Sequence, residues 1–275
     1  MSGAGSVRDA IAAATDALAA AGCDTPQLDA EVLIADALGV DRGALVTGAA
    51  SDVPASSARD IGERVRRRVM REPVAYIVGR KGFRNIDLAV DSRVLIPRPE
   101  TELLVELALD APRGARVHEV GTGSGAVALA LMHERPDLRV SASDVSPGAI
   151  DVARANARAL GLDLPLAVAD GLPDPIAFGD VRPYDLVLAN LPYVSIGEMA
   201  TLAPEIRDHE PHDALVSGRE GLDAIRDLVA EIPAGTRVAL EHSPHQAQAV
   251  RGLLDEAETH RDLGGRERVT VGTAR

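Results

Sequence analysis

A four-residue segment, Asn190-Leu191-Pro192-Tyr193, closes an apolar run at residues 184–189. The segment presents an amide side chain, a backbone carbonyl beside a proline, and an aromatic ring. Asn190 Oδ1 and the Leu191 carbonyl can accept both N–H bonds of a planar NH2 group, so that its nitrogen pyramidalises as a transition state forms. Pro192 would stiffen this geometry, and Tyr193 would stack on the planar group. The segment therefore predicts catalytic and substrate-binding residues for chemistry at a planar nitrogen, although the same four residues also occur in ordinary turns.

A glycine-rich segment, Glu119-Val120-Gly121-Thr122-Gly123-Ser124-Gly125, connects an expected strand at 115–120 to an expected helix at 126–134. Glycines allow positive φ and remove side chains where a ligand approaches the backbone, and the following helix offers free N–H groups. The spacing differs from the dinucleotide fingerprint G-x-G-x-x-G, and a segment of this kind can also be only a tight turn. Its candidate cofactor-binding residues are Glu119, Gly121, Thr122, Gly123 and Gly125.

Two further acids end the next two expected strands. Asp144, followed by Val145, is placed to accept the hydroxyl protons of a ribose, and Asp170, beside Gly171, suits an adenine amino group. With Glu119 they make three consecutive acidic strand ends. Such an array fits S-adenosylmethionine, which offers an ammonium, a ribose diol and an exocyclic amine, better than NAD, whose diphosphate would need a cradle. Each acid alone could instead cap a helix. The predicted chemistry is methyl transfer, which depends mainly on alignment and electrostatics and needs no strong base.

The apolar pattern indicates the elements that must position these residues. Between residues 7 and 71 apolar residues recur at helical spacing, with stripes such as Leu28, Val32 and Ala35, which predicts a small helical bundle. A β-like pattern over residues 76–96, punctuated by glycines, predicts a hairpin between two domains. After residue 115 strands and helices alternate, which favours an α/β fold with a doubly wound, Rossmann-like sheet. The expected later elements are a helix near 221–230, a strand at 236–241, a helix at 244–258 and a strand at 268–271.

Composition limits the possible partners. The chain has 275 residues, and 42 acidic against 29 basic side chains give a net charge of -13, which opposes nonspecific binding to phosphate backbones. Cys23 is the only cysteine, so an intrachain disulfide is excluded. No apolar stretch approaches the roughly 20 residues of a membrane span, and the start lacks the pattern of a signal peptide. We therefore expect a cytoplasmic protein with no membrane partner and no stable nucleic-acid partner.

Two clusters of side chains admit more than one interpretation. An arginine-rich helix at residues 59–71 is expected to present a solvated face, although docking on an acidic partner or RNA would use the same residues. Four histidines, His209, His212, His242 and His245, make two His-x-x-His spacings. They flank prolines in expected loops, and the predicted reaction needs no metal, so we expect surface histidines and no metal site.

Together with residues 71–80 and 94–102, these motifs closely resemble the peptide-chain-release-factor glutamine N(5)-methyltransferases, the HemK or PrmC family. The resemblance runs from about residue 7 to the C-terminus. It implies a Rossmann-like class I methyltransferase that uses S-adenosylmethionine to methylate the glutamine in the Gly-Gly-Gln loop of peptide chain release factors. Within the second segment, Arg98 and Glu100 become candidate substrate-binding residues. Two departures are Leu191, where the family usually has proline, and Glu119, where it usually has aspartate.

The resemblance also assigns functions to the expected domains. Residues 1–75 would be a helical substrate-binding domain, residues 76–97 a β-hairpin linker, and residues 98–275 the S-adenosylmethionine-dependent methyltransferase domain. The alternatives are an adenine-N6 methyltransferase acting on RNA or DNA, a paralogue that methylates another protein, and a binding protein that keeps the fold without activity. Base flipping usually needs stacking aromatics and a basic channel. The chain has few aromatic residues, which argues against the adenine alternative.

Overall fold

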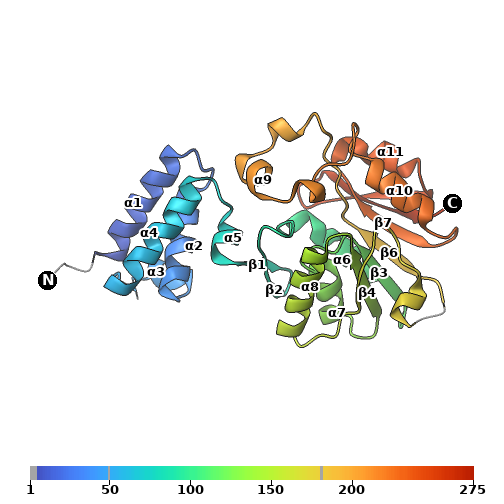
Figure 1. The fold of residues 1–275 in the computed structure, drawn as a ribbon, viewed down its shortest axis with the longest axis horizontal. Coiled ribbons are helices and arrows are strands. Elements are labelled where there is room, and N and C mark those ends of the chain that lie inside the picture. Colours follow the sequence, from blue (N-terminus) through green and yellow to red (C-terminus); the bar gives the residue numbers. More distant parts are fainter. Residues whose placement is uncertain (1–4, 49, 180–181) are drawn as a thin grey trace. The chain divides into compact units, whose positions relative to one another are not determined.

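The computed structural model describes residues 5–48, 50–179 and 182–275, which form two compact units (Figure 1). The first unit contains the described residues up to Gly79 together with a later segment, Ala203–His209. The second contains the described residues of Arg80–Leu202 and Glu210–Arg275. Among the described residues, no helix combines the length and the apolar character that crossing a bilayer requires.

The first unit is a helical bundle, as expected. Its helices are α1 (Val7–Ala20), α2 (Pro26–Leu38), α3 (Arg42–Val46), α4 (Ala55–Val69), α5 (Val74–Val78) and α9 (Pro204–His209). Within α2 the expected stripe is wrong at Leu28, which is 42% exposed, because Ala30 and Ile34 face the bundle core instead. Residues 76–78, expected as β-like, form the end of α5, which Pro73 precedes and which Gly79 ends in the left-handed conformation.

The second unit begins with the expected hairpin, formed by the antiparallel strands β1 (Arg80–Phe83) and β2 (Ile86–Ala89). Phe83 and Leu88 lie in the core of this unit. The side chain of Asn156 accepts from the Ala89 N–H at 2.8 Å and donates to the Ala89 carbonyl at 3.0 Å, so the end of the hairpin is fixed to α8 (Pro147–Ala159). Residues 94–96, expected to extend the β pattern, form no strand.

A seven-stranded sheet organises the described part of the second unit, in the order β5-β4-β3-β6-β7-β9-β8 (Figure 1). The first five strands of that order are parallel, and β9 is antiparallel to both of its neighbours. This arrangement confirms the expected doubly wound, Rossmann-like α/β fold with a modified C-terminal edge. The bounds are β3 (Arg116–Val120), β4 (Arg139–Asp144), β5 (Leu166–Val168), β6 (Leu186–Ala189), β7 (Arg237–Glu241), β8 (Asp255–Arg261) and β9 (Glu267–Thr273).

Helices cover both faces of this sheet. On one face, α6 (Glu102–Ala108), α7 (Ala126–Glu134) and α8 pack in a common core with strand residues such as Leu188. On the other face, α10 (Asp223–Glu231) and α11 (Ala247–Arg251) pack with strand residues such as Val187. Successive residues of β6 therefore point to opposite faces, which explains why the central strands are continuous apolar runs.

The expected helix at 244–258 is the main error in the predicted elements. The helix α11 ends at Arg251, and β8 forms the edge of the sheet by pairing with β9. The sequence of β8, Asp-Glu-Ala-Glu-Thr-His-Arg, has the composition of an exposed helix face. In the structure it is an edge strand with one solvated face. Its pairing with β9 is interrupted at Glu256, which has a φ of 50°.

Candidate active site

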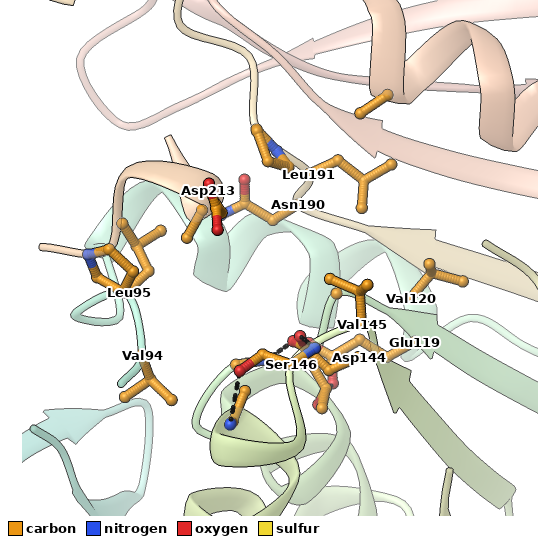
Figure 2. Close-up of a pocket in the computed structure, with 18 of the residues that line it drawn as sticks. Val94, Leu95, Glu119, Val120, Asp144, Val145, Ser146, Asn190, Leu191 and Asp213 are labelled. Carbon is orange, nitrogen blue, oxygen red and sulfur yellow. Dashed lines mark hydrogen bonds between the residues drawn. The ribbon is translucent and has the colours of Figure 1, made fainter. Parts of the chain in front are cut away.

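A cavity of about 990 Å³ opens where the carboxyl ends of the parallel strands meet (Figure 2). This is the edge at which doubly wound sheets bind ligands, at the point where the chain order reverses on either side of β3. Twelve predicted site residues line it, namely Arg98, Glu119, Gly121, Thr122, Gly123, Asp144, Val145, Asp170, Gly171, Asn190, Leu191 and Pro192. Three others, Glu100, Gly125 and Tyr193, are not part of this lining.

The glycine turn after β3 forms one wall of the cavity. Its φ angles are 73° at Gly121 and 54° at Gly123, in the left-handed region that favours glycine. A Cβ on Gly121 would lie 3.0 Å from Leu191 Cδ2, so the turn passes closely beneath the Asn190-Leu191 segment. At Gly125 a Cβ would lie 2.8 Å from Leu129 Cδ1, and the role of that glycine is therefore the packing of α7.

Glu119 lies at the inner end of this wall and is 4% exposed. Its Oε2 accepts hydrogen bonds from Thr122 Oγ1 at 2.6 Å and from the Ala128 N–H at 2.9 Å. Burial raises the pKa of Glu119 to about 7, and these two hydrogen bonds oppose the rise. The carboxyl therefore takes up and releases a proton near neutral pH, and a cationic ligand would favour its ionised form.

Asp144 holds its carboxylate in a fixed orientation at the end of β4 (Figure 2). Oδ2 accepts from the Gly123 N–H and Oδ1 from the Ser146 N–H, each at 2.9 Å. Burial raises the pKa of Asp144, and these backbone donors oppose that rise. The next residue, Val145, lines the cavity although it is 60% exposed, so an apolar surface stands beside the carboxylate.

Asp170 and Gly171 continue the wall after β5. Gly171 has a φ of 80°, and a Cβ there would lie 2.0 Å from Glu231 Oε2. Glu231 reaches this point from α10 and accepts the Leu172 N–H at 2.9 Å. Sequence reasoning missed Glu231, because it lies 60 residues beyond Gly171 on a helix whose polar face looks solvated. Glu231 is therefore one of three acids in the cavity lining, with Asp213 and Asp227, beyond the three that were predicted.

Asn190 stands across the cavity from Glu119, Asp144 and Ser146 (Figure 2). Its Nδ2 donates to Thr101 Oγ1 at 3.0 Å. Because the nitrogen end of the amide is occupied in this way, Oδ1 remains as the acceptor that the predicted chemistry requires. Thr101, at the start of α6, also lines the cavity, and sequence reasoning did not single it out.

Tyr193 is not part of the cavity lining, and its stacking role stays a prediction. Its ring packs against the core shared with α10, and its hydroxyl donates to Glu241 Oε1 at 3.2 Å. Burial raises the pKa of the Tyr193 hydroxyl, so the hydroxyl keeps its proton. The Tyr193 carbonyl accepts from Gln246 Nε2 at 3.0 Å, and a Cβ on Gly221 would lie 2.1 Å from that carbonyl oxygen. Tyr193 therefore anchors the segment through its ring, its hydroxyl and its carbonyl.

Arg98 and Glu100 separate in the structure. Arg98 lines the cavity and is ion-paired with the buried Glu210, whose Oε2 also accepts the Ile96 N–H at 3.2 Å. Glu210 thereby holds residues 96–98 against the far wall. Glu100 lies off that wall, close enough to Glu241 for its charge to raise the pKa of that residue.

His212 and His245 are exposed, as expected, whereas His242 is not at the surface. His242 is fully buried, with Nε2 2.8 Å from Thr270 Oγ1 and Nδ1 2.9 Å from the Ser243 carbonyl oxygen. Its ring thus joins β7 to β9, while His245 is exposed near Glu198. Across the described ranges, no group of three or more histidine, cysteine or acidic side chains has the arrangement of a metal site.

Comparison with known proteins places this cavity in context. Residues 9–79 match the family model of the PrmC N-terminal domain, and residues 99–207 match the methyltransferase small domain. The chain is 41% identical to the release factor glutamine methyltransferase of Xylella fastidiosa, over 93% of this chain and 96% of that protein. It is also 41% identical to the protein of the same name from Cereibacter sphaeroides, over 95% and 96% of the two chains.

A solved structure supports the fold alone. The catalytic domain of hMettl16 is 14% identical and matches with a TM-score of 0.51, over 76% of this chain and 80% of that one. At this identity the likeness concerns the arrangement of strands and helices.

Proposed function

The chain belongs to the release factor glutamine methyltransferase family, and from this membership we propose that it methylates the side-chain amide nitrogen of a glutamine in a protein, using S-adenosylmethionine. The target proposed for this chain is the glutamine in the Gly-Gly-Gln loop of peptide chain release factors. The family membership spans nearly the whole chain, so the proposal covers the helical unit as well as the sheet.

The residues of the glycine-turn wall fit the methyl donor. The donor, when bound, supplies an electrophilic methyl group on a sulfonium. Asp144 is oriented by two backbone N–H groups, and its remaining lone pairs can accept the hydroxyls of a ribose. Asp170 and Val145 would receive the amino group and the face of an adenine. Glu119 adds a buried carboxyl that favours a cation.

The single observation that carries the proposed reaction is the orientation of the Asn190 amide. Its Nδ2 is held by Thr101, so Oδ1 and the Leu191 carbonyl are the two acceptors offered to a planar NH2 group. Gripping both N–H bonds turns the nitrogen lone pair out of conjugation as the new bond forms, and this interaction strengthens toward the transition state. The nitrogen loses its proton after the transfer, when it has become cationic.

Leu191 keeps the acceptor that the usual proline would supply, because the acceptor is a backbone carbonyl. Its side chain fills the space above Gly121, where a Cβ on that glycine would lie 3.0 Å from Leu191 Cδ2. We therefore expect the substitution to leave the reaction unchanged and to affect only the packing between the acceptor segment and the glycine turn.

The test is to incubate the protein with isotopically labelled methyl donor and either a release factor or RNA, and to locate the label by mass spectrometry. We expect the label on the glutamine of the Gly-Gly-Gln loop, and none on a release factor in which that glutamine is replaced by asparagine. Label on an adenine base would instead establish the adenine-N6 alternative, and the absence of label from both the release factor and the RNA would contradict the proposed target.

A further inference from the structure

We propose that Glu241, acting through Thr101, sets which end of the Asn190 amide faces the target, so that both are positioning residues for the methyl transfer. The inference deepens the proposed function and rests on it. It concerns a side chain that lies behind the cavity wall and does not touch the target.

Strand register places Glu241 beside Asn190. Ala189, the last residue of β6, is paired with Leu240 of β7. The residues that follow them, Asn190 and Glu241, therefore stand next to each other where the strands end. Two residues earlier, Leu188 and Ala239 belong to the core that α6 shares. Because side chains alternate between the faces of a sheet, Asn190 and Glu241 also point to the side of α6, which begins beside Thr101.

Thr101 connects the two side chains. It is 5% exposed, and its hydroxyl oxygen receives the Asn190 Nδ2 hydrogen bond at 3.0 Å. A hydroxyl has a single proton to donate. If that proton is directed to the Glu241 carboxylate, the oxygen presents only lone pairs to Asn190. The amide must then offer its NH2 end to Thr101 and its oxygen to the cavity.

Glu241 is built to receive that proton. It is 1% exposed, and Oε1 accepts from the Tyr193 hydroxyl at 3.2 Å. Oε2 makes no hydrogen bond of ordinary geometry with the described residues, but the Thr101 hydroxyl lies close enough for its hydrogen bonding to lower the pKa of the carboxyl. An unsatisfied buried carboxylate oxygen is costly, so it favours the Thr101 proton turned toward it.

The charges around Glu241 determine when it is ionised. Burial raises the pKa of Glu241 to about 7, and the Glu100 carboxylate adds to the rise, whereas Arg268 on β9 opposes it. In the protonated state the carboxyl can donate to Thr101, which frees the Thr101 proton to donate to Asn190. The Asn190 amide then turns its NH2 end toward the target, and its N–H groups would face the N–H groups of the target amide. Activity should therefore be lost as Glu241 takes up a proton.

The first test compares Thr101→Val with Thr101→Ser and with the control Thr270→Val. Thr270 is also a fully buried threonine, but its hydroxyl bonds to His242 and Thr259. Measured on a release factor at pH 8, Thr101→Val should lower kcat by about 10- to 100-fold. Thr101→Ser and Thr270→Val should stay within about threefold of the wild type, and the donor dissociation constant should change less than about twofold. Wild-type kcat in Thr101→Val would overturn the proposal, as would an equal loss in Thr270→Val.

The second test follows the pH profile of kcat at saturating donor and target, which a purely structural role would not change. The wild type should lose activity below about pH 7, and Glu241→Gln should have a lower kcat without this acidic limb. A limb that persists in Glu241→Gln would overturn the role of Glu241. The proposed function is decided by whether the wild type modifies glutamine or adenine. The positioning role of Glu241 and Thr101 is decided separately, by the ratio of the variant kcat to the wild-type kcat on whichever substrate is modified.

Discussion

At the scale of single residues, the proposed ribose-binding role of Asp144 can be tested directly. Its carboxylate is fixed by the Gly123 and Ser146 N–H groups, so replacement by alanine removes an oriented charge without disturbing the strand that carries it. We predict that Asp144→Ala weakens donor binding by about 10- to 100-fold, the range expected for hydrogen bonds to a charged group. Calorimetry should show this change, while Asp151→Ala, on the exposed face of α8, should bind as the wild type does. An unaltered dissociation constant in Asp144→Ala would refute the ribose assignment.

Glu119 gives donor binding a dependence on pH. Its folded pKa of about 7 lies above the ordinary 4.5, so without donor its contribution to stability is complete below pH 4.5 and is lost as the pH rises through 7. A cationic ligand favours the carboxylate and must release the proton below pH 7. The dissociation constant of S-adenosylmethionine should therefore rise as the pH falls from 8 to 5.

Two glutamine variants separate this effect from that of Glu241. In Glu119→Gln the dissociation constant should become independent of pH over this range, whereas in Glu241→Gln it should keep the wild-type dependence. A donor affinity that varies with pH equally in wild type and Glu119→Gln would show that another group carries the proton.

The residues of the site could be predicted to the extent that they are local in sequence. The acids at the strand ends and the Asn190-Leu191-Pro192 acceptors line one cavity, because parallel strands end at one edge. Thr101 and Glu231 could not be found in this way, because their positions depend on helices that are distant in sequence. A usable signal existed for Glu241, which directly follows the apolar Val238-Ala239-Leu240.

At the scale of elements, the position of the acceptor segment, residues 190–193, depends on the close approach of Gly221 to the Tyr193 carbonyl. Gly221 has a φ of 70°, and a Cβ there would lie 2.1 Å from the Tyr193 carbonyl oxygen. Gly114 has a nearly equal φ of 73° with open space around it. Gly114→Ala should thus cost only the left-handed backbone, about 1–2 kcal/mol. Gly221→Ala should cost more and also lower turnover, because it displaces Tyr193.

Chemical unfolding and turnover of the two glycine variants check this prediction. Equal losses of stability, with turnover unchanged in Gly221→Ala, would mean that the loop containing Gly221 can move away without disturbing the acceptor segment.

The helices and strands were predictable where the residues at their ends and their apolar pattern indicate the same element that packing forms. Helix α7 has the predicted bounds because Gly125 starts it and Arg135 precedes a proline. Residues 255–258 were misassigned to a helix because an edge strand with one solvated face has no apolar run to distinguish it from a helix surface. In α5, the short run Tyr76-Ile77-Val78 has strand-like composition, but the flanking proline and glycine favour a helical turn.

At the scale of the whole molecule, the first unit is assembled from two distant parts of the chain. Glu205 of α9 is ion-paired with Arg68 at 2.8 Å and with Arg71 at 2.7 Å, and Arg68 is also paired with Asp29 at 2.7 Å. The Arg68 side chain is 7% exposed. The unit that matches the PrmC N-terminal domain therefore contains Ala203–His209, a segment that follows Asn190-Leu191-Pro192-Tyr193 in the sequence. Most arginines of this helix are paired with acids of the same unit, and the buried Arg68 departs from the solvated face that was expected.

Removing this pairing should destabilise the first unit. Glu205→Gln leaves the buried Arg68 with the Asp29 carboxylate and the Glu72 carbonyl as partners, and we expect a loss of about 2–3 kcal/mol, below the full cost of an unpaired buried charge. Glu63→Gln, which breaks an exposed pair with Arg66, should have no measurable effect. Hydrogen exchange of the α2 and α4 amides measures the difference, and identical protection in the two variants would show that α9 does not stabilise the bundle.

The central claim, that the Asn190 amide and the Leu191 carbonyl hold the target nitrogen, is tested most directly by single-turnover methylation with Asn190→Ala. Donor affinity measured on the same preparation shows whether the cavity is intact. Our account predicts that the rate falls by about 10²- to 10³-fold, as for loss of one transition-state acceptor, while the donor dissociation constant stays nearly the same. A rate equal to that of the wild type would contradict the account.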